Sequence, residues 1–126
     1  SPEELRVPDY IINDVLEANG IPYQETRSLE ESMPELDILY MTRVQKERFL
    51  DEEEFNRVKD SFVLDPSKLR TAKPDMIVLH PLPRVNEIAY DVDDNPKAYY
   101  FEQARNGVFA RQAIITKALG LQIPPK

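Results

Sequence analysis

The sequence predicts an α/β fold, a three-layer sandwich with a small parallel sheet and helices on both faces. Two short, nearly continuous apolar runs, 36–41 and 76–79, are typical of buried strands. Helical patterns lie before, between and after these runs, and strands that alternate with helices usually form a parallel sheet. At 126 residues the chain has the length of one domain, which we expect to cover residues 1–126.

The chain opens with a helical pattern over residues 10–19. Its apolar residues keep the spacing of one helix face, and Gly20 follows as a common C-terminal cap. The next stretch, 21–26, has the composition of a short strand. Because no strand precedes the first helix and few strands follow, we expect a small sheet that is short of partners.

Capping signals mark the later helices. Ser28 and Glu31 have the spacing of a capping box, which predicts a short helix there. The polar stretch 51–61 predicts a surface helix, and Asp65, followed by proline, predicts the N-cap of another short helix. The longest pattern, 99–119, predicts a final helix that stops at a glycine.

Composition excludes several classes of function. Without cysteine the chain has no disulfide, thiol nucleophile or thiolate metal site, and its one histidine, His80, cannot build a multi-histidine metal site. Three widely separated glycines cannot form a Gly-rich phosphate loop. The net charge of −7 argues against binding of nucleic acid or of an anionic membrane. We therefore expect a cytoplasmic protein without a metal, a cofactor, a signal peptide or a membrane span.

Polar side chains follow the first predicted strand. Arg43 and Gln45 are two residues apart, so an extended backbone would point both side chains the same way. The planar guanidinium suits a carboxylate or phosphate, and the glutamine amide can donate to the same anion. The carboxyl ends of parallel strands are where such sheets bind ligands, so this pair predicts an anion site. The plainer alternative is a surface ion pair between Arg43 and Glu47.

The second predicted strand ends in two prolines. Pro81 and Pro83 flank Leu82 directly after His80. Proline has no amide hydrogen, so backbone carbonyls here are left to accept hydrogen bonds from an amino or amide group of a ligand. A cis peptide before either proline would mark a constrained turn. The alternative is simple strand termination, and we expect His80 to be a structural histidine rather than a base.

The acidic clusters predict no site of their own. The run 51–54 is interpreted as a solvated helix start, where negative charge is favourable. The aspartates at 91, 93 and 94 suggest calcium only weakly, because the twelve-residue loop pattern with its central glycine is missing.

Three ordered motifs resemble the catalytic chain of aspartate transcarbamoylase. The run 37–49 is similar to the family's aspartate-loop segment, 80–88 to a second signature, and 100–113 to its closing helix. The sister ornithine transcarbamoylase family would be expected to have cysteine at position 81 and to lack the Arg-Val-Gln segment. The chain thus resembles the aspartate-binding half, a Rossmann-like half of a two-domain transcarbamoylase.

The resemblance implies the function of aspartate carbamoyltransferase, an enzyme of pyrimidine biosynthesis. A carbamoyl group passes from carbamoyl phosphate to the amino group of L-aspartate, giving N-carbamoyl-L-aspartate and phosphate. Arg43 and Gln45 would hold the aspartate carboxylates. The carbonyls of Pro81 and Leu82 would accept hydrogen bonds from the carbamoyl amide and the attacking amine. The peptide between Leu82 and Pro83 is expected to be cis.

The resemblance also implies residues for domain closure. Glu47 would orient Arg43, and Arg48 would bridge to the other domain on closure. Glu54 falls in the family's mobile loop. Phe55 departs from the pattern, because a tyrosine is often found there, so any contact through a phenol hydroxyl is lost.

Partners follow from what the resemblance leaves out. Nothing here resembles the carbamoyl-phosphate-binding domain, so we expect no catalytic residue in this chain and no activity from it alone. The final helix should expose an apolar surface that in the family packs toward that domain. Complete chains of the family form homotrimers, to which regulatory chains can be added. Two alternatives remain open: a free-standing, non-catalytic amino-acid-binding or interaction module, and an α/β domain whose charges are only surface groups.

Overall fold

The computed structural model describes residues 5–44, 49, 51–59 and 62–121. Strands and α-helices alternate with short 3-10 helices, and one turn of π-helix interrupts the first helical segment. In chain order the elements are α1 Asp9–Ile11, π-helix Ile12–Leu16, 3-10 helix Glu17–Asn19, α2 Leu29–Ser32, 3-10 helix Met33–Glu35, β1 Ile38–Tyr40, α3 Glu52–Val58, 3-10 helix Lys68–Thr71, β2 Ile77–Leu79, 3-10 helix Tyr90–Val92 and α4 Tyr100–Ala118.

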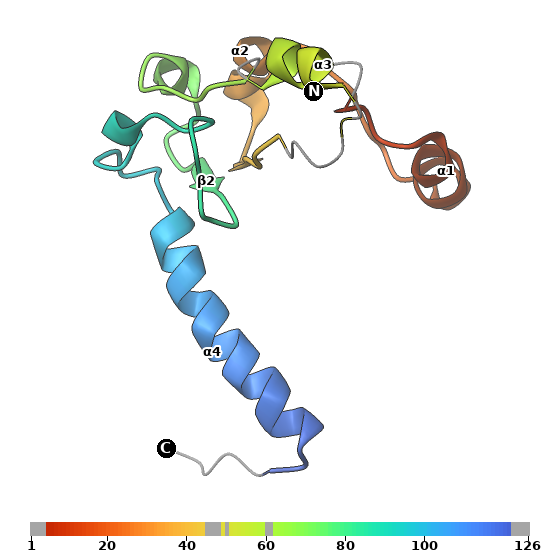
Figure 1. The fold of residues 1–126 in the computed structure, drawn as a ribbon, viewed down its shortest axis with the longest axis vertical. Helices are drawn as coiled ribbons and strands as arrows, with labels where there is room; N and C mark the ends of the chain where they lie inside the picture. The colour runs from red at the N-terminus through yellow and green to blue at the C-terminus, as the bar shows by residue number, and fades with distance from the viewer. Residues whose placement is uncertain (1–4, 45–48, 50, 60–61, 122–126) are drawn as a thin grey trace.

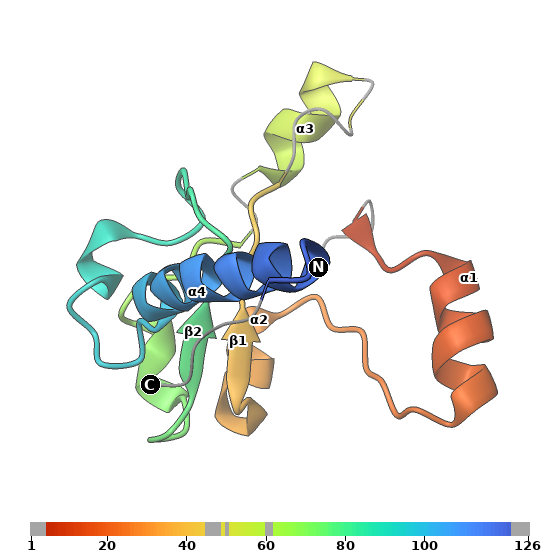
Figure 2. The same ribbon diagram turned by 90° about the horizontal axis from the view of Figure 1, so that it is seen from below.

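The two strands pair in parallel and form the middle layer. Ile38 lies opposite Ile77, and Tyr40 lies opposite Leu79. Helix α4 crosses the near side of the strands in Figure 2, and α2 lies on their far side. Figure 1 shows the same order from the side, with β2 between α2 and α4. The predicted α/β arrangement, a small parallel sheet with helices on both faces, is confirmed.

The hydrophobic core fills the space between these layers. Leu39 and Val78 supply its centre from the two strands, and Tyr100 covers them from the first turn of α4, where it is fully buried. The other members come from α2, the 3-10 helices and the connecting loops: Leu29, Met33, Met41, Leu64, Leu69, Met76, Ile88 and Val92.

Two of the predictions about strands are wrong. The run 36–41 predicts a buried strand, but Ile38 and Tyr40 are 55% and 53% exposed, and only Leu39 between them is buried within β1. Residues 21–26 were expected to form a strand and contain none. The physical reason is the same in both cases, because a strand is stable only when neighbouring strands and a covering layer accept its hydrogen bonds and side chains.

The helix boundaries follow the local signals. Gly20 ends the first helical segment with a φ of 63°. The Ser28 hydroxyl accepts the backbone N–H three residues later, at 3.1 Å, as the capping box predicts. The carboxylates of Asp51 and Asp65 each accept the N–H two residues later, at 2.9 and 2.8 Å. The predicted cap at Ser28 is confirmed, and Asp51 is the N-cap of α3. The predicted N-cap at Asp65 is wrong, because the helix that follows is a 3-10 helix that begins at Lys68 with Ser67 as its N-cap.

Two parts of the molecule project from the central body. Figure 1 shows α1 as a separate arm, and it shows α4 extending away from the strands for most of its length. The predicted apolar surface on the final helix is confirmed, since four of its large apolar side chains beyond the first two turns are more than half exposed: Val108, Phe109, Ile114 and Ile115. Among the described residues, no helix combines the length and apolar character that crossing a bilayer requires.

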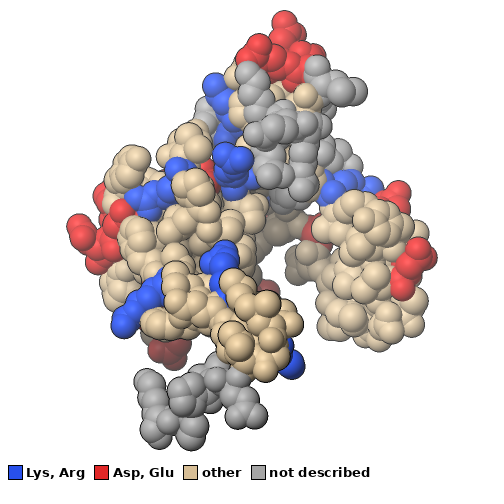
Figure 3. Space-filling model, turned by 60° about the horizontal axis from the view of Figure 1, so that its bottom comes forward, with Lys and Arg blue, Asp and Glu red and all other residues tan. Residues whose placement is uncertain are grey.

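Charge is unevenly distributed over the surface. In Figure 3 acidic side chains gather at the tip formed by α3, on the outer side of the α1 arm and at the opposite edge of the central body. Lysine and arginine are scattered over the central body in the same view.

Candidate functional site

The carboxyl ends of β1 and β2 lie side by side at one edge of the sheet. The pairing continues one residue past the strands, where the Met41 N–H donates to the Leu79 carbonyl at 2.8 Å. Arg43 therefore follows the end of one strand and Pro81 follows the end of its neighbour. This is the place at which parallel sheets present loops to ligands.

A glutamine of α4 joins the two strand ends. The side-chain carbonyl of Gln103 accepts the backbone N–H of His80 at 2.9 Å. Its amide group donates to the Tyr40 hydroxyl at 3.2 Å. One side chain thus ties the exit of β2 to the last residue of β1, which fixes the spacing of the two segments that follow.

The loop after β2 is closed by a buried histidine and glutamate. His80 is 1% exposed and Glu87 is 4% exposed. The Nε2 atom of His80 lies 2.7 Å from Oε1 of Glu87. The backbone N–H of Leu82 donates to the other ring nitrogen, Nδ1, at 2.9 Å. His80 is therefore a fully hydrogen-bonded structural residue, and its acidic partner is one that lies seven positions further along the sequence.

Glu87 is stabilised as a carboxylate inside this loop. Its Oε2 atom accepts the backbone N–H groups of Val85 and Asn86 at 3.0 and 3.1 Å. Burial by itself would raise the pKa of the Glu87 carboxyl, but the hydrogen bonds from backbone N–H groups and from His80 outweigh it, so the pKa is lowered. The loop thus contains an ionised acceptor at neutral pH.

A second polar cluster anchors the end of the same loop to α4. The Arg84 guanidinium pairs with the Asp93 carboxylate through two hydrogen bonds, one of them 2.6 Å long. The Tyr100 hydroxyl donates to Asp93 and accepts from Arg84. Arg84 also lies over the ring of Tyr90, 4.7 Å from its centroid. These contacts join the segment 84–100 to the core.

The charged and polar groups of this cluster shift one another's pKa values. The hydrogen bond from Arg84 is the main reason that the pKa of Asp93 is lowered, and Asp93 in turn raises the pKa of Arg84. Burial, followed by the hydrogen bond to Asp93, raises the pKa of Tyr100 to about 12. The charged pair and the neutral phenol therefore stabilise one another.

The predicted ligand-binding residues lie at the expected edge as far as the structure describes them. Arg43 and Pro81 are exposed, whereas Leu82 is half-buried and packs against the core. The peptide between Leu82 and Pro83 is cis, as expected, and Leu82 has a φ of 47°. Neither the Pro81 nor the Leu82 carbonyl accepts a hydrogen bond from another described residue.

Other predicted site residues fall outside the described part. Gln45, Glu47 and Arg48 are not among the described residues, and Glu54 belongs to α3 but its side chain is likewise outside the description. Among the residues that the structure describes, no group of acidic or histidine side chains could hold a metal ion. Asp93, part of the weak calcium pattern, is instead paired with Arg84.

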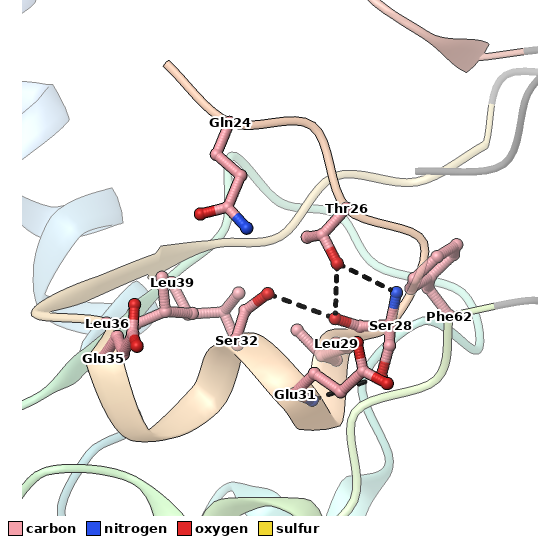
Figure 4. A pocket seen from close by; sticks show the side chains of 10 residues that line it. All are labelled: Gln24, Thr26, Ser28, Leu29, Glu31, Ser32, Glu35, Leu36, Leu39 and Phe62. Carbon is pink, nitrogen blue, oxygen red and sulfur yellow. Dashed lines mark hydrogen bonds between the residues drawn. The ribbon is translucent and has the colours of Figure 1, made fainter. Parts of the chain in front are cut away.

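A cavity of about 390 Å³ lies elsewhere on the domain. Figure 4 shows it between the segment 24–26, helix α2 and the side chains of Leu36, Leu39 and Phe62. Several of its polar groups are already engaged with one another, for example Thr26 and Ser32 with the Ser28 carbonyl. None of the predicted ligand-binding residues lines it, so the strand ends remain the candidate site.

The family is decided by comparison with known sequences. Residues 1–117 match the family model described as the Asp/Orn binding domain of aspartate/ornithine carbamoyltransferase. The chain belongs to this family. Within the carbamoyltransferases it is similar to the aspartate members. It is 56% identical over 121 residues to the aspartate carbamoyltransferase catalytic subunit of Clostridium acetobutylicum, and 60% identical over 121 residues to that of Lachnoclostridium phytofermentans. Each match covers 96% of this chain and 39% of the relative's length.

Solved carbamoyltransferase structures have the same fold. The catalytic subunit of M. jannaschii aspartate transcarbamoylase matches with a TM-score of 0.81 and 46% identity, over 93% of this chain and 38% of that one. The Trypanosoma cruzi enzyme in complex with carbamoyl phosphate and aspartate matches with a TM-score of 0.81 and 36% identity, over 91% of this chain and 38% of that one. The chain therefore spans about two-fifths of the length of the carbamoyltransferase chains that it matches.

Sequence reasoning assigned no role to several residues of this site. Glu87, Gln103 and Tyr100 belong to motifs that resemble the carbamoyltransferases, but nothing in their spacing indicates their partners. Gln103 contacts a residue 63 positions away in the chain. Only its polar character, close after buried Tyr100 on the same helix, signals a side chain that requires hydrogen bonds inside the domain.

Proposed function

We propose that this chain is the aspartate-binding part of an aspartate carbamoyltransferase. The reaction transfers the carbamoyl group of carbamoyl phosphate to the amino group of L-aspartate and releases phosphate. The observation that carries the proposal is the juxtaposition at the sheet edge. Arg43 follows β1, and the carbonyls of Pro81 and Leu82 follow the paired strand β2. A cationic donor for carboxylates thus follows one strand, and neutral acceptors for an amine follow the strand paired with it.

The proposed roles follow from this chemistry. Arg43 and Gln45 bind the two carboxylates of aspartate, since guanidinium and amide groups offer several donors to an anion. The carbonyls of Pro81 and Leu82 accept hydrogen bonds from the attacking amine and the carbamoyl amide. Binding at both ends fixes the direction of the amine toward the carbamoyl carbon, so this chain contributes orientation rather than covalent chemistry.

Domain closure belongs to the same proposal. Glu47 orients Arg43, Arg48 bridges to the carbamoyl-phosphate-binding domain, and Glu54 acts in the loop that controls closure. The exposed apolar side chains of α4 support the presence of such a domain, because an apolar surface of this extent is normally covered. We further propose a homotrimer of complete chains in the cytoplasm, with a role in pyrimidine biosynthesis.

A hybrid catalytic subunit tests the proposal directly. The segment of the Clostridium acetobutylicum relative that matches this chain, 121 residues long, is replaced by this chain. We expect the hybrid to form N-carbamoyl-L-aspartate and to reject L-ornithine. The chain without the rest of the subunit should show no turnover. A folded hybrid without activity, or turnover by the chain alone, would contradict the proposal.

The carboxylate site is tested in the same hybrid. Arg43→Ala should raise the L-aspartate concentration required for half-maximal rate by an amount equivalent to about 2–5 kcal/mol, the usual result of removing one partner of a desolvated charge pair. Arg43→Lys keeps the charge but not the planar fork, and serves as the matched control with a smaller rise. If Arg43→Ala changes almost nothing, the arginine is only a surface charge.

Calorimetry distinguishes the remaining alternative. L-aspartate is titrated into the chain alone, and then into a mixture with the separately prepared carbamoyl-phosphate-binding domain of the same relative. We expect binding only in the mixture. Tight binding to the chain alone, unchanged by the added domain, would favour a free-standing binding module.

A further inference from the structure

The orientation of the Pro81 carbonyl is set by a hydrogen bond on the other side of the same peptide group. The Leu82 N–H donates to Nδ1 of His80 at 2.9 Å. Among the described residues the one cis peptide joins Leu82 to Pro83, so the peptide between Pro81 and Leu82 is trans. In a trans peptide the carbonyl and the N–H point in opposite directions. The Pro81 carbonyl therefore points away from the buried imidazole.

The same contact defines the tautomer of His80. A ring nitrogen that accepts a hydrogen bond carries no proton, so Nδ1 is bare and the proton of the neutral ring is on Nε2. That nitrogen lies 2.7 Å from a Glu87 carboxylate oxygen, which is an acceptor for it. Glu87 is held in turn by the backbone N–H groups of Val85 and Asn86. The chain of contacts runs without a gap from the loop backbone to the Pro81–Leu82 peptide.

Burial makes this chain of contacts rigid. His80 and Glu87 are 1% and 4% exposed, so water cannot substitute for a lost partner. Leu82 adopts a φ of 47°, which is uncommon for a residue with a side chain and persists only where the surroundings hold it. The hydrogen bond from its N–H to His80 is one of the contacts that hold it.

We infer that His80 and Glu87 are positioning residues for the substrate amine: Glu87 holds His80 as the Nε2–H tautomer, and the bare Nδ1 aims the Pro81 carbonyl at the ligand. The inference rests on the proposed function, because the ligand is the amine of that reaction. It gives His80 a part in the reaction without contact with substrate and without proton transfer. A ring that is protonated on Nδ1 would lose the Leu82 hydrogen bond and release the peptide.

The tautomer can be measured directly in this chain. His80 is its one histidine, so ¹⁵N-labelled histidine gives a single imidazole spectrum. At neutral pH we expect coupling patterns of a bare Nδ1 and a protonated Nε2. An Nδ1–H tautomer, or a ring protonated on both nitrogens, would overturn the inference whatever the reaction is.

Two substitutions of His80 separate positioning from stability. In the hybrid subunit, His80→Asn keeps an amide oxygen near the place of Nδ1, as an acceptor for the Leu82 N–H. His80→Gln keeps an amide donor near the place of Nε2, toward Glu87, but loses the acceptor. We expect His80→Gln to lower kcat at least about tenfold, the equivalent of one lost hydrogen bond to a reacting group, and His80→Asn to recover most of it. Equal losses in the two variants would contradict positioning.

A pair of ligands provides a readout that a purely structural role does not change. Succinate has both carboxylates of aspartate but no amine. His80→Gln should weaken the binding of L-aspartate several-fold more than the binding of succinate. The KM measures the first, and the inhibition constant of succinate as a competitive inhibitor measures the second. Tyr100→Phe removes a different buried hydrogen bond and is the stability control. In this variant the ratio of the aspartate KM to the succinate inhibition constant should not change. If His80→Gln weakens the binding of succinate and of aspartate by the same factor, His80 is only structural.

The outcomes also separate this inference from the proposed function. An unsubstituted hybrid that forms no N-carbamoyl-L-aspartate contradicts the proposed function, and the positioning role falls with it. An active hybrid in which the two variants behave alike contradicts only the positioning role.

Discussion

The loop 80–87 and the N-terminal segment 5–25 keep their shape by different means. The loop has almost no regular structure, yet buried side chains fix its backbone through His80 and Glu87. The N-terminal segment is mostly helical, and its side-chain contacts include ones within the segment itself, from Tyr23 to Glu17 and from Arg6 to Glu25. Regular structure thus needs only local signals, whereas the exact placement of a carbonyl acceptor needs buried partners.

Helix α4 shows the same difference within one element. Its first turns contribute the buried Tyr100 and the bridging Gln103 to the strand ends. Its later turns form an equally regular helix, in which Ile114 is 67% exposed. The helix ends at Gly120, with a φ of 67°, without any need for tertiary contacts there.

The largest expected effect breaks the loop. Glu87→Ala leaves the buried Nε2–H of His80 without its carboxylate acceptor and removes the hydrogen bonds from the Val85 and Asn86 N–H groups to that carboxylate. We expect a loss of about 3–5 kcal/mol in the free energy of unfolding, measured by urea titration, because three hydrogen bonds to a charged group are lost and hydrogen bonds of this kind contribute about 1.5–3 kcal/mol each. Glu53→Ala, at an exposed position of α3, is the control and should stay within about 0.5 kcal/mol. Similar midpoints for the two variants would mean that the buried network contributes little.

A pH titration tests the cluster of Arg84, Asp93 and Tyr100 that anchors the end of the loop. The pKa of Tyr100 is raised to about 12, so the folded state binds this proton more tightly than the unfolded state, in which the ordinary value is about 10. The stabilisation is complete below pH 10 and is lost as pH rises toward 12, by about 2–3 kcal/mol. Urea midpoints measured between pH 9 and 12 should fall steeply, and Tyr100→Phe should flatten this part of the curve. Parallel curves would contradict the assignment.

Two glycines test the locally determined helices. Gly20 has a φ of 63° with open space around it, so Gly20→Ala costs only backbone strain, about 1 kcal/mol. Gly107 lies inside α4, where alanine is the better helix former, and its nearest obstacle is the flexible end of Arg111. Gly107→Ala should therefore stabilise the chain by about 0.5–1 kcal/mol. Thermal unfolding of both variants checks the opposite signs, and equal signs would contradict the local interpretation.

The smallest effect lies on the projecting part of α4. Ile114→Gln should change the unfolding free energy of this chain by less than about 0.5 kcal/mol, because the side chain is largely exposed. Val78→Ala, at a fully buried position of β2, should cost about 2 kcal/mol or more. In the hybrid subunit the cost of Ile114→Gln should increase, since the proposed domain would cover this face. An unchanged cost there would mean that α4 stays open to solvent.

The sequence predicted those elements whose signals are local. The cap at Ser28 and the glycines that end two helical segments, Gly20 and Gly120, fall where expected, because each depends on a few neighbouring residues. The strand predicted at 21–26 failed, because strand formation depends on partners that no local pattern reveals. The prediction that β1 is buried was wrong for a related reason. An apolar run shows which side chains can be buried, but it does not show whether another part of the chain covers them.

In the candidate site, too, some residues could be predicted from local sequence, whereas other contacts depend on the tertiary structure. Residue types and their position after apolar runs were enough to select Arg43, Pro81 and Leu82, and the motif resemblance supplied the cis peptide. Only the tertiary structure decided that Glu87 meets His80, that Gln103 ties the two strand ends together, and that Asp93 joins Arg84 to Tyr100. Such pairings depend on the path of the chain through the core, because hydrogen bonds act over about 3 Å regardless of how many residues separate the partners.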